Sequence, residues 1–138
     1  MIYIDTGAFI ARYLYKDQYH SASVKYWEQI ENNNKRCFTS NFVLDEILTL
    51  LARRTDYKFA SRRGRNILLS GAFTIIRPAY EDELLALNIF EKYSDLEISF
   101  TDCISFVLIN KNKINSVFSF DKHFSILGFN VFPSTAHR

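Results

Sequence analysis

Apolar residues follow two alternating patterns along the chain, short continuous runs and longer stretches with helical spacing. The short runs predict strands at residues 2–4, 36–39, 73–76, 116–120 and 130–132. The stretches with apolar residues three or four positions apart predict helices from residue 8, at 21–31, from 40 or 41, at 58–70, 80–93 and 102–109, with a helical turn near 123. Strands that alternate with helices are typical of α/β proteins with a parallel sheet.

The chain of 138 residues has no internal repeat or linker, so we expect one domain over residues 1–138, with a frayed tail at 133–138. Apolar runs such as 106–109 are far shorter than the ~18 residues of a membrane-spanning helix. The first residues lack the basic region of a signal peptide. Cys37 and Cys103 form no metal or redox motif. We therefore expect a cytoplasmic protein without a membrane partner.

Charge is unevenly distributed, although the formal net charge is only +2. Residues 52–66 contain a single acid and the six bases Arg53, Arg54, Lys58, Arg62, Arg63 and Arg65. Such a cluster suits contacts with phosphates, and it equally suits a solvated helix face. Residues 79–102 contain seven acids and one base. The acidic helix within them is expected to be solvated on the side of Glu81, Asp82 and Glu91.

Several common catalytic motifs are missing. The four glycines do not form a dinucleotide-binding or P-loop motif, and no GxSxG motif marks a serine hydrolase. The histidines His20, His123 and His137 lack the spacing of a zinc site. The chemistry must therefore come from other side chains.

Carboxylates stand where an open parallel sheet binds ligands, beyond the carboxyl ends of its strands. Asp5 ends the first strand and Asp121 follows the strand at 116–120. Asp102 lies in the first turn of a helix, and Glu46 lies on the most apolar helix, where an unpaired carboxylate is costly to bury. One shared role explains these positions better than four separate ones. Clusters of oxygen ligands favour Mg²⁺ or Mn²⁺.

Each acid also has a purely structural explanation. Asp5 suits a turn, Asp102 and Asp121 suit helix caps, and Glu46 suits a helix edge. Asp45 is an alternative to its neighbour Glu46. However, three residues one turn from Glu46 are apolar, against two for Asp45, so Glu46 is expected to face inward.

Four segments resemble, in order and spacing, the successive motifs of PIN-domain nucleases, above all VapC-like toxins of bacterial toxin–antitoxin pairs. They are Asp5-Thr6 after the first strand and residues 39–46, 99–103 and 118–124. The resemblance implies a three-layer α/β/α sandwich with a central, mostly parallel sheet. It also implies a Mg²⁺-dependent endoribonuclease, with Mn²⁺ as a second candidate ion, that cuts single-stranded or structured RNA. An antitoxin protein and a homodimer are the partners expected from the family.

The resemblance assigns roles to individual residues of this chain. The catalytic and metal-binding positions of the family fall on Asp5, Glu46, Asp102 and Asp121. Thr6 and Thr101 match its supporting hydroxyl positions, and His123 stands where many relatives have a further acid. The residues expected to bind nucleic acid or the antitoxin are Arg53, Arg54, Arg62, Arg63 and Arg65.

Two other functions fit parts of the sequence. One is a catalytically inactive PIN-like module that binds RNA or a protein, which the presence of all four acids disfavours. The other is a phosphoryl-transfer domain with Asp5 as its nucleophile, although the lysine motif that such a domain needs is not evident. Tyr13, Tyr15 and Tyr19 suit stacking on bases, but in a chain with 16% aromatic residues packing is the favoured interpretation.

Overall fold

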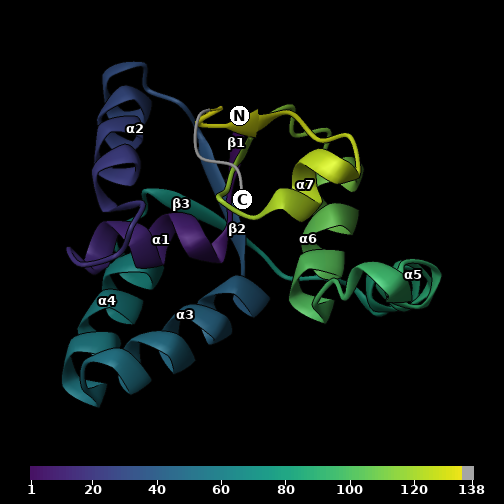
Figure 1. The fold of residues 1–138 in the computed structure, drawn as a ribbon, viewed down its shortest axis with the longest axis horizontal. Coiled ribbons are helices and arrows are strands. Elements are labelled where there is room, and N and C mark those ends of the chain that lie inside the picture. Colours follow the sequence, from purple (N-terminus) through teal and green to yellow (C-terminus); the bar gives the residue numbers. More distant parts are fainter. Residues whose placement is uncertain (135–138) are drawn as a thin grey trace.

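A central sheet of five parallel strands organises the computed structural model, which describes residues 1–134 (Figure 1). The strands are β1 (Ile2–Ile4), β2 (Cys37–Ser40), β3 (Phe73–Ile76), β4 (Val117–Phe118) and β5 (Val131–Phe132). Their order across the sheet is β3-β2-β1-β4-β5, and every neighbouring pair is parallel. The prediction of a parallel sheet is confirmed. The frayed tail predicted at 133–138 falls largely on residues 135–138, outside the described part.

Helices cover both faces of this sheet (Figure 1). They are α1 (Thr6–Tyr13), α2 (His20–Asn32), α3 (Asn41–Arg54), α4 (Tyr57–Leu69), α5 (Tyr80–Lys92), α6 (Phe100–Lys111) and α7 (Lys122–Ile126), with a 3₁₀ turn, η1 (Ser94–Leu96). Right-handed connections place α1 to α4 on one face and α5 to α7 on the other, because the strand order advances in opposite directions from β1. The predicted three-layer α/β/α sandwich is therefore confirmed.

The strand order reverses between β1 and β4, which are neighbours in the middle of the sheet. Tyr3 pairs with Val117 and Ile4 with Phe118. Beyond these pairs the two strands end side by side at Asp5 and Ser119, and the N–H of Asp5 still donates to the carbonyl of Phe118 at 3.0 Å. Open α/β sheets bind ligands at such a reversal point.

Local sequence sets the helix starts, with one difference from expectation. The hydroxyl of Ser40 accepts a hydrogen bond from the N–H of Val43 at 3.2 Å, which caps α3 as predicted. The helix predicted from residue 8 begins two residues earlier, because Asp5 is extended and α1 starts directly at Thr6 without an intervening turn. The carboxylate at the end of β1 is thus also at the N-terminus of a helix.

The core lies on both faces of the sheet. All of β1 is buried, and on one face Phe9 and Trp27 pack with ring centroids 5.5 Å apart. On the other face α6 is buried continuously from Asp102 to Ile109. A helix so enclosed by apolar neighbours fixes the position of the acid at its first turn.

The acidic helix α5 differs from the prediction at Asp82. Its side chain is buried, and its carboxylate accepts from the N–H of Ala79 at 2.8 Å and from Lys111 Nζ at 3.0 Å. The predicted solvation of Asp82 is therefore wrong, because a cation on the neighbouring helix α6 pairs with it. None of the helices described in residues 1–134 is long and apolar enough to cross a membrane.

Candidate active site

A cavity of about 390 Å³ opens at the carboxyl ends of β1 and β4. Four of the six acids that line it come from four different elements: Asp5 after β1, Glu46 on α3, Asp102 in the first turn of α6 and Asp121 at the start of α7. The hydroxyl-bearing Thr6 also lines the cavity. Residues far apart in the sequence thus bring their carboxylates into one space.

Asp5 is the most constrained of the four acids. Its side chain is buried, and Oδ2 accepts a hydrogen bond of 2.7 Å from the hydroxyl of Ser119. Oδ1 is buried without a hydrogen-bond partner, as is Oγ1 of Thr6. Buried polar atoms are nearly always paired, so these two oxygens are candidates to bind a ligand.

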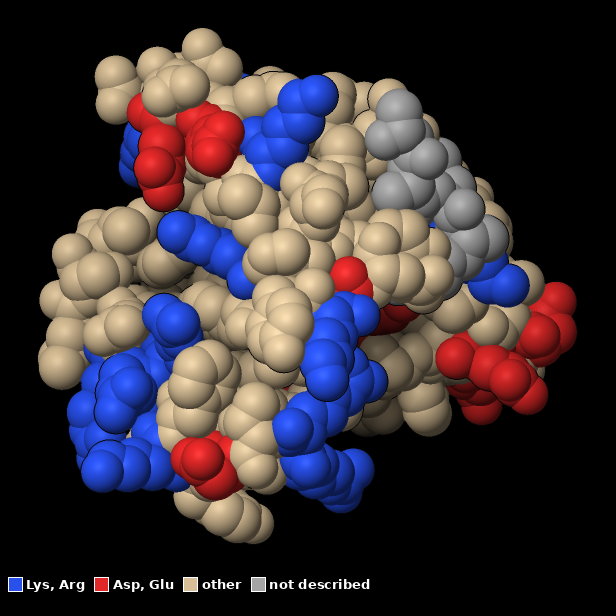
Figure 2. Space-filling model, turned by 60° about the vertical axis from the view of Figure 1, so that its left-hand side comes forward, with Lys and Arg blue, Asp and Glu red and all other residues tan. Residues whose placement is uncertain are grey.

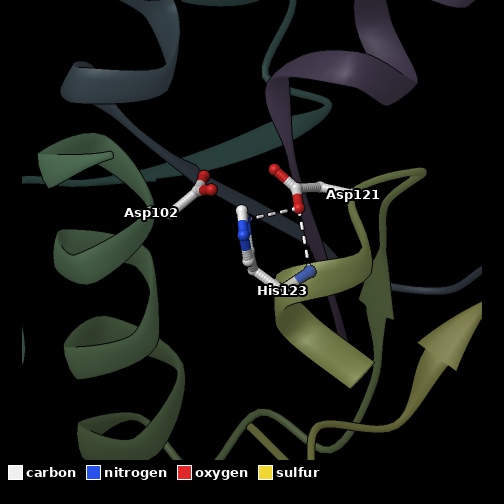
Figure 3. A group of neighbouring side chains, drawn as sticks. All are labelled: Asp102, Asp121 and His123. Atoms are coloured by element: carbon white, nitrogen blue, oxygen red, sulfur yellow. Dashed lines mark hydrogen bonds and ion pairs between the residues drawn. The ribbon is translucent and has the colours of Figure 1, made fainter. Parts of the chain in front are cut away.

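Asp102, Asp121 and His123 point toward one another from α6 and the start of α7 (Figure 3). One potential ligand atom from each of the three lies within 4.8 Å of the others. Asp121 Oδ1 accepts from the N–H of His123 at 2.8 Å and therefore also caps α7. Nδ1 of His123 is 2.9 Å from the same oxygen but lacks the geometry of a hydrogen bond to it. Asp121 therefore caps α7 and also belongs to the cluster with Asp102 and His123.

Burial and mutual repulsion raise the pKa of two carboxyl groups. For Asp5 the main cause is loss of water, opposed by the Ser119 hydrogen bond and increased by the charge of Asp121. For Asp102 the main cause is again burial, followed by the charges of Asp5 and Asp121. Ionising these carboxyl groups together is therefore unfavourable without a cation, and a bound cation would favour their charged forms.

The donors in the cavity fit a divalent cation. Carboxylate and hydroxyl oxygens are hard ligands, which suit Mg²⁺ and Mn²⁺ better than softer metals. Asp5 Oδ1 and Thr6 Oγ1 supply unpaired oxygens at the cavity wall. The cluster of Asp102, Asp121 and His123 adds further potential metal ligands beside these oxygens.

The predicted site residues on α3 and in the first turn of α6 differ in how they are placed relative to the cavity. Glu46 is half-buried at the cavity, whereas its neighbour Asp45 is exposed. Thr101 does not line the cavity, although Ser99 and Asp102 on either side of it do. The hydroxyl of Ser99 accepts from the N–H of Asp102 at 3.1 Å, so Asp102 is held by the helix cap while its carboxylate joins the cluster.

Sequence reasoning did not assign Ser119, Asp17 and Glu97 to the site. Ser119 bonds to Asp5, and Asp17 and Glu97 line the cavity. The position of Ser119 two residues before Asp121, on the same strand end, was an available signal. Asp17 and Glu97 lie in connecting segments, where no apolar pattern indicates their direction.

Basic side chains gather on the part of the molecule built by α3 and α4, near a hollow where acidic side chains are visible (Figure 2). Arg53, Arg54, Arg62 and Arg65 are all exposed, and of these four Arg54 lines the cavity. Arg63 is half-buried, with its guanidinium 4.8 Å from the ring centroid of Tyr13. Arg63 is thus partly engaged in packing, and Arg54 is the cation at the site.

The three candidate tyrosines for base stacking have different surroundings. Tyr13 packs near Phe9 at 6.2 Å between ring centroids, and Tyr19 stacks on Phe120 at 4.7 Å. Tyr15 is 76% exposed. The packing interpretation therefore fits Tyr13 and Tyr19 but is wrong for Tyr15.

Comparisons with known proteins agree on one family. The model of the PIN-domain family matches residues 2–130. A protein named VapC ribonuclease from Archaeoglobus fulgidus is 35% identical over 127 residues, 89% of this chain and 78% of that protein. The 23S rRNA-specific endonuclease VapC20 of Mycobacterium tuberculosis is 30% identical over 129 residues, 94% of this chain and 95% of that protein.

The fold comparison gives the same result. The crystal structure of Mycobacterium tuberculosis VapC20, described as a sarcin-ricin loop cleaving toxin, superposes with a TM-score of 0.82 and 28% identity. The match covers 94% of this chain and 96% of that one.

Proposed function

Because the chain belongs to the PIN-domain family, we propose that it is a metal-dependent endoribonuclease, the toxin of a toxin–antitoxin pair. The similar proteins from Archaeoglobus fulgidus and Mycobacterium tuberculosis are named as ribonucleases of the VapC group. The reaction is hydrolysis of a phosphodiester bond in single-stranded or structured RNA.

One observation supports this function above all others. Asp5, Glu46, Asp102 and Asp121 line one cavity, where Asp5 Oδ1 is buried without a partner. Four ionised carboxylates in one cavity repel one another and destabilise the fold unless a cation offsets their charge. A phosphate-cleaving site needs such a cluster to hold cations beside a polyanion.

Each residue has a role in the proposed site. Asp5 and Asp102 hold the cation, because they are buried and their charge is the least compensated. Glu46 and Asp121 complete the set of ligands, with Mg²⁺ the expected ion and Mn²⁺ a substitute. When bound there, such an ion would lower the pKa of a water molecule and stabilise negative charge on the phosphate. Thr6 supports the acids from the cavity wall, and Ser119 orients Asp5. Thr101, which does not line the cavity, is expected to support the acids only through the family resemblance.

Binding of the RNA must come from cations outside the cluster, since the acids repel phosphate. Arg54 is the nearest candidate, and Arg53, Arg62 and Arg65 extend the basic surface over α3 and α4. Arg63 belongs to the same surface, which an antitoxin would also contact. We expect the protein to form a homodimer.

The main alternative is a PIN-like module that binds RNA or protein without cutting it. An inactive module has no need for four acids in one cavity, which favours the enzyme.

Incubation of the purified protein with bacterial ribosomes and with deproteinised total RNA, in Mg²⁺ and in EDTA, separates the two functions. The 23S rRNA is the first RNA to examine, because a similar protein is named for cutting it. Discrete cuts with 5′-phosphate ends that disappear in EDTA are expected. Binding without cleavage in Mg²⁺ and in Mn²⁺ would favour the inactive module.

A further inference from the structure

We propose that a second cavity, next to the catalytic one, binds an unpaired nucleotide of the RNA, with its base stacked on Tyr15. This nucleotide subsite depends on the proposed ribonuclease function, since it accommodates the residue that adjoins the scissile phosphate. The subsite lies at the connection between α1 and α2 and at the C-terminal end of α3.

The two cavities are neighbours that share two lining residues. The second has a volume of about 420 Å³ and is lined by Leu14, Tyr15, Lys16, Asp17, Arg54 and Thr55. Asp17 and Arg54 also line the catalytic cavity. A strand with one phosphate at the acids would therefore pass Arg54 and place the adjoining nucleotide in the second cavity.

Tyr15 is the side chain in this cavity best suited to hold a base. It is 76% exposed, unlike Tyr13 and Tyr19, whose rings pack against other aromatic rings. An aromatic ring with so much exposed surface buries little of its apolar area in the folded protein. Stacking on a base would bury the ring of Tyr15. Such stacking does not depend on which base is bound, because every base has a π face.

The segment that carries Tyr15 is held in place by hydrogen bonds on both sides. The N–H of Asp17 donates to the carbonyl of Leu14 at 2.9 Å, and the carboxylate of Asp17 accepts from the N–H of Tyr19 at 2.8 Å. Nδ1 of His20 donates to the carbonyl of Ala11 at 2.8 Å. The ring is thus presented by an ordered connection, which reduces the entropy lost on binding.

The combination of cations with an exposed aromatic ring favours RNA over an acidic peptide at the subsite. Lys16 Nζ is 5.9 Å from the ring centroid of Tyr15, and no acid of residues 1–134 forms an ion pair with Arg54. Both cations can therefore contact phosphates on either side of the stacked base. An acidic peptide would use the cations but would leave the exposed ring of Tyr15 without a matching group.

The test measures binding of a short, fluorescein-labelled single-stranded RNA by anisotropy in EDTA, where no cleavage occurs. Tyr15→Ala should weaken binding about fivefold or more, and Tyr15→Phe should remain within about twofold of the wild type, since it keeps the stacking face. The matched control is Tyr80→Ala on the acidic helix α5, because Tyr80 is 72% exposed but lines neither cavity. Arg54→Ala should weaken binding. Arg36→Ala should not, because Arg36 directly precedes β2 at the amino ends of the strands and lines neither cavity.

A direct readout is ultraviolet crosslinking of the same RNA carrying 4-thiouridine, with the adduct mapped by mass spectrometry to the peptide that contains Tyr15. Equal affinity of the wild type and Tyr15→Ala, together with crosslinks elsewhere, would overturn the subsite. Cleavage by the wild type in Mg²⁺ is measured on the same preparation. If it cleaves while Tyr15→Ala binds normally, only the subsite fails; if the wild type neither binds nor cleaves RNA, the proposed function fails with it.

Discussion

The hydroxyl of Ser119 donates a hydrogen bond of 2.7 Å to Oδ2 of Asp5, which lies 114 residues away in the sequence. The hydroxyl oxygen of Ser119 also accepts a hydrogen bond of 2.9 Å from the N–H of Asp121. Ser119 therefore joins the carboxylate after β1 to the backbone after β4. With Oδ2 held in this way, Oδ1 of Asp5 is left unpaired at the cavity.

Replacing this serine should weaken metal binding without removing a ligand. In Ser119→Ala, Asp5 loses the donor that orients it, and we expect the dissociation constant for Mn²⁺ to rise about tenfold, as for other groups that hold a metal ligand in place. Isothermal titration calorimetry measures the change. Ser125→Ala, an exposed serine on α7, is the control. An unchanged dissociation constant in Ser119→Ala would refute the orienting role.

Neutralising one buried acid should stabilise the metal-free protein. Asp102→Asn removes a carboxylate whose pKa is raised by burial and by its acidic neighbours, while asparagine keeps the first turn of α6 capped through Ser99. A gain of about 1 kcal/mol would raise the melting temperature in EDTA by roughly 3 °C. Asp95→Asn, at an exposed position, should have little effect.

Bound metal should make the wild type more stable than Asp102→Asn, the reverse of the order in EDTA. At about a hundred times its dissociation constant, Mg²⁺ should stabilise the wild type by ~2.7 kcal/mol and Asp102→Asn by clearly less. Thermal melts in Mg²⁺ and in EDTA give both values. Two results together would contradict this: a wild-type melting temperature that does not change with Mg²⁺ or Mn²⁺, and an Asp102→Asn variant that is less stable than the wild type in EDTA. Asp102 would then serve only in the capped first turn of α6.

Stability of the metal-free protein should fall as pH rises through the acidic range. Burial raises the pKa of Asp5 from its ordinary value of 3.8 to about 7. Below 3.8 both the folded and the unfolded state bind this proton; above it the folded state binds more protons, so the free energy of unfolding decreases until Asp5 itself ionises. We expect a loss of about 1–3 kcal/mol over this window. Urea denaturation in EDTA measures it, and a slope identical to that of Asp5→Asn would contradict the assignment.

The ion pair between α5 and α6 should have the opposite pH dependence. The N–H of Ala79 and the ammonium of Lys111 lower the pKa of Asp82, so its contribution is present above 3.8 and is lost as pH falls through the folded-state pKa. Asp82→Ala should lower the free energy of unfolding by about 1–2 kcal/mol, since it removes both a helix cap and an ion pair. Lys111→Ala should cost less, because the lysine side chain is 55% exposed.

Neither substitution should alter Mn²⁺ affinity, since Asp82 and Lys111 do not line the catalytic cavity. Glu81→Ala, an exposed acid on the same helix, should change stability by no more than about 0.5 kcal/mol. Equal costs for Asp82→Ala and Glu81→Ala would show that the ion pair contributes nothing.

The architecture could be predicted because it depends on local patterns. An acid directly after a short apolar run, as at Asp5, signals both the end of a strand and a position at the ligand-binding edge of a parallel sheet. The start of α1 could not be predicted in the same way. The segment after β1 suits a turn, and only packing of Ala8 and Phe9 into the core decides in favour of a helix from Thr6.

Contacts between distant segments explain the other differences. Asp82 is one of several acids on an acidic helix, and nothing local distinguishes it; its partner Lys111 lies 29 residues further along the chain. Tyr13, Tyr15 and Tyr19 are the same residue type within one short segment, so the sequence does not distinguish them. Their rings differ because those of Tyr13 and Tyr19 meet Phe9 and Phe120, a contact that residue type alone does not encode.

The central claim is that the four converging carboxylates form the site that cuts RNA. The most direct measurement compares Mg²⁺-dependent RNA cleavage by the wild type, Asp5→Asn, Glu46→Gln and Asp45→Asn, at equal concentration and with folding checked by circular dichroism. Cleavage should fall at least about a hundredfold in Asp5→Asn and Glu46→Gln, because each removes charge from the cavity, and should be retained in Asp45→Asn, whose side chain is exposed. Full cleavage by Asp5→Asn, or loss of cleavage in Asp45→Asn with Glu46→Gln active, would contradict it.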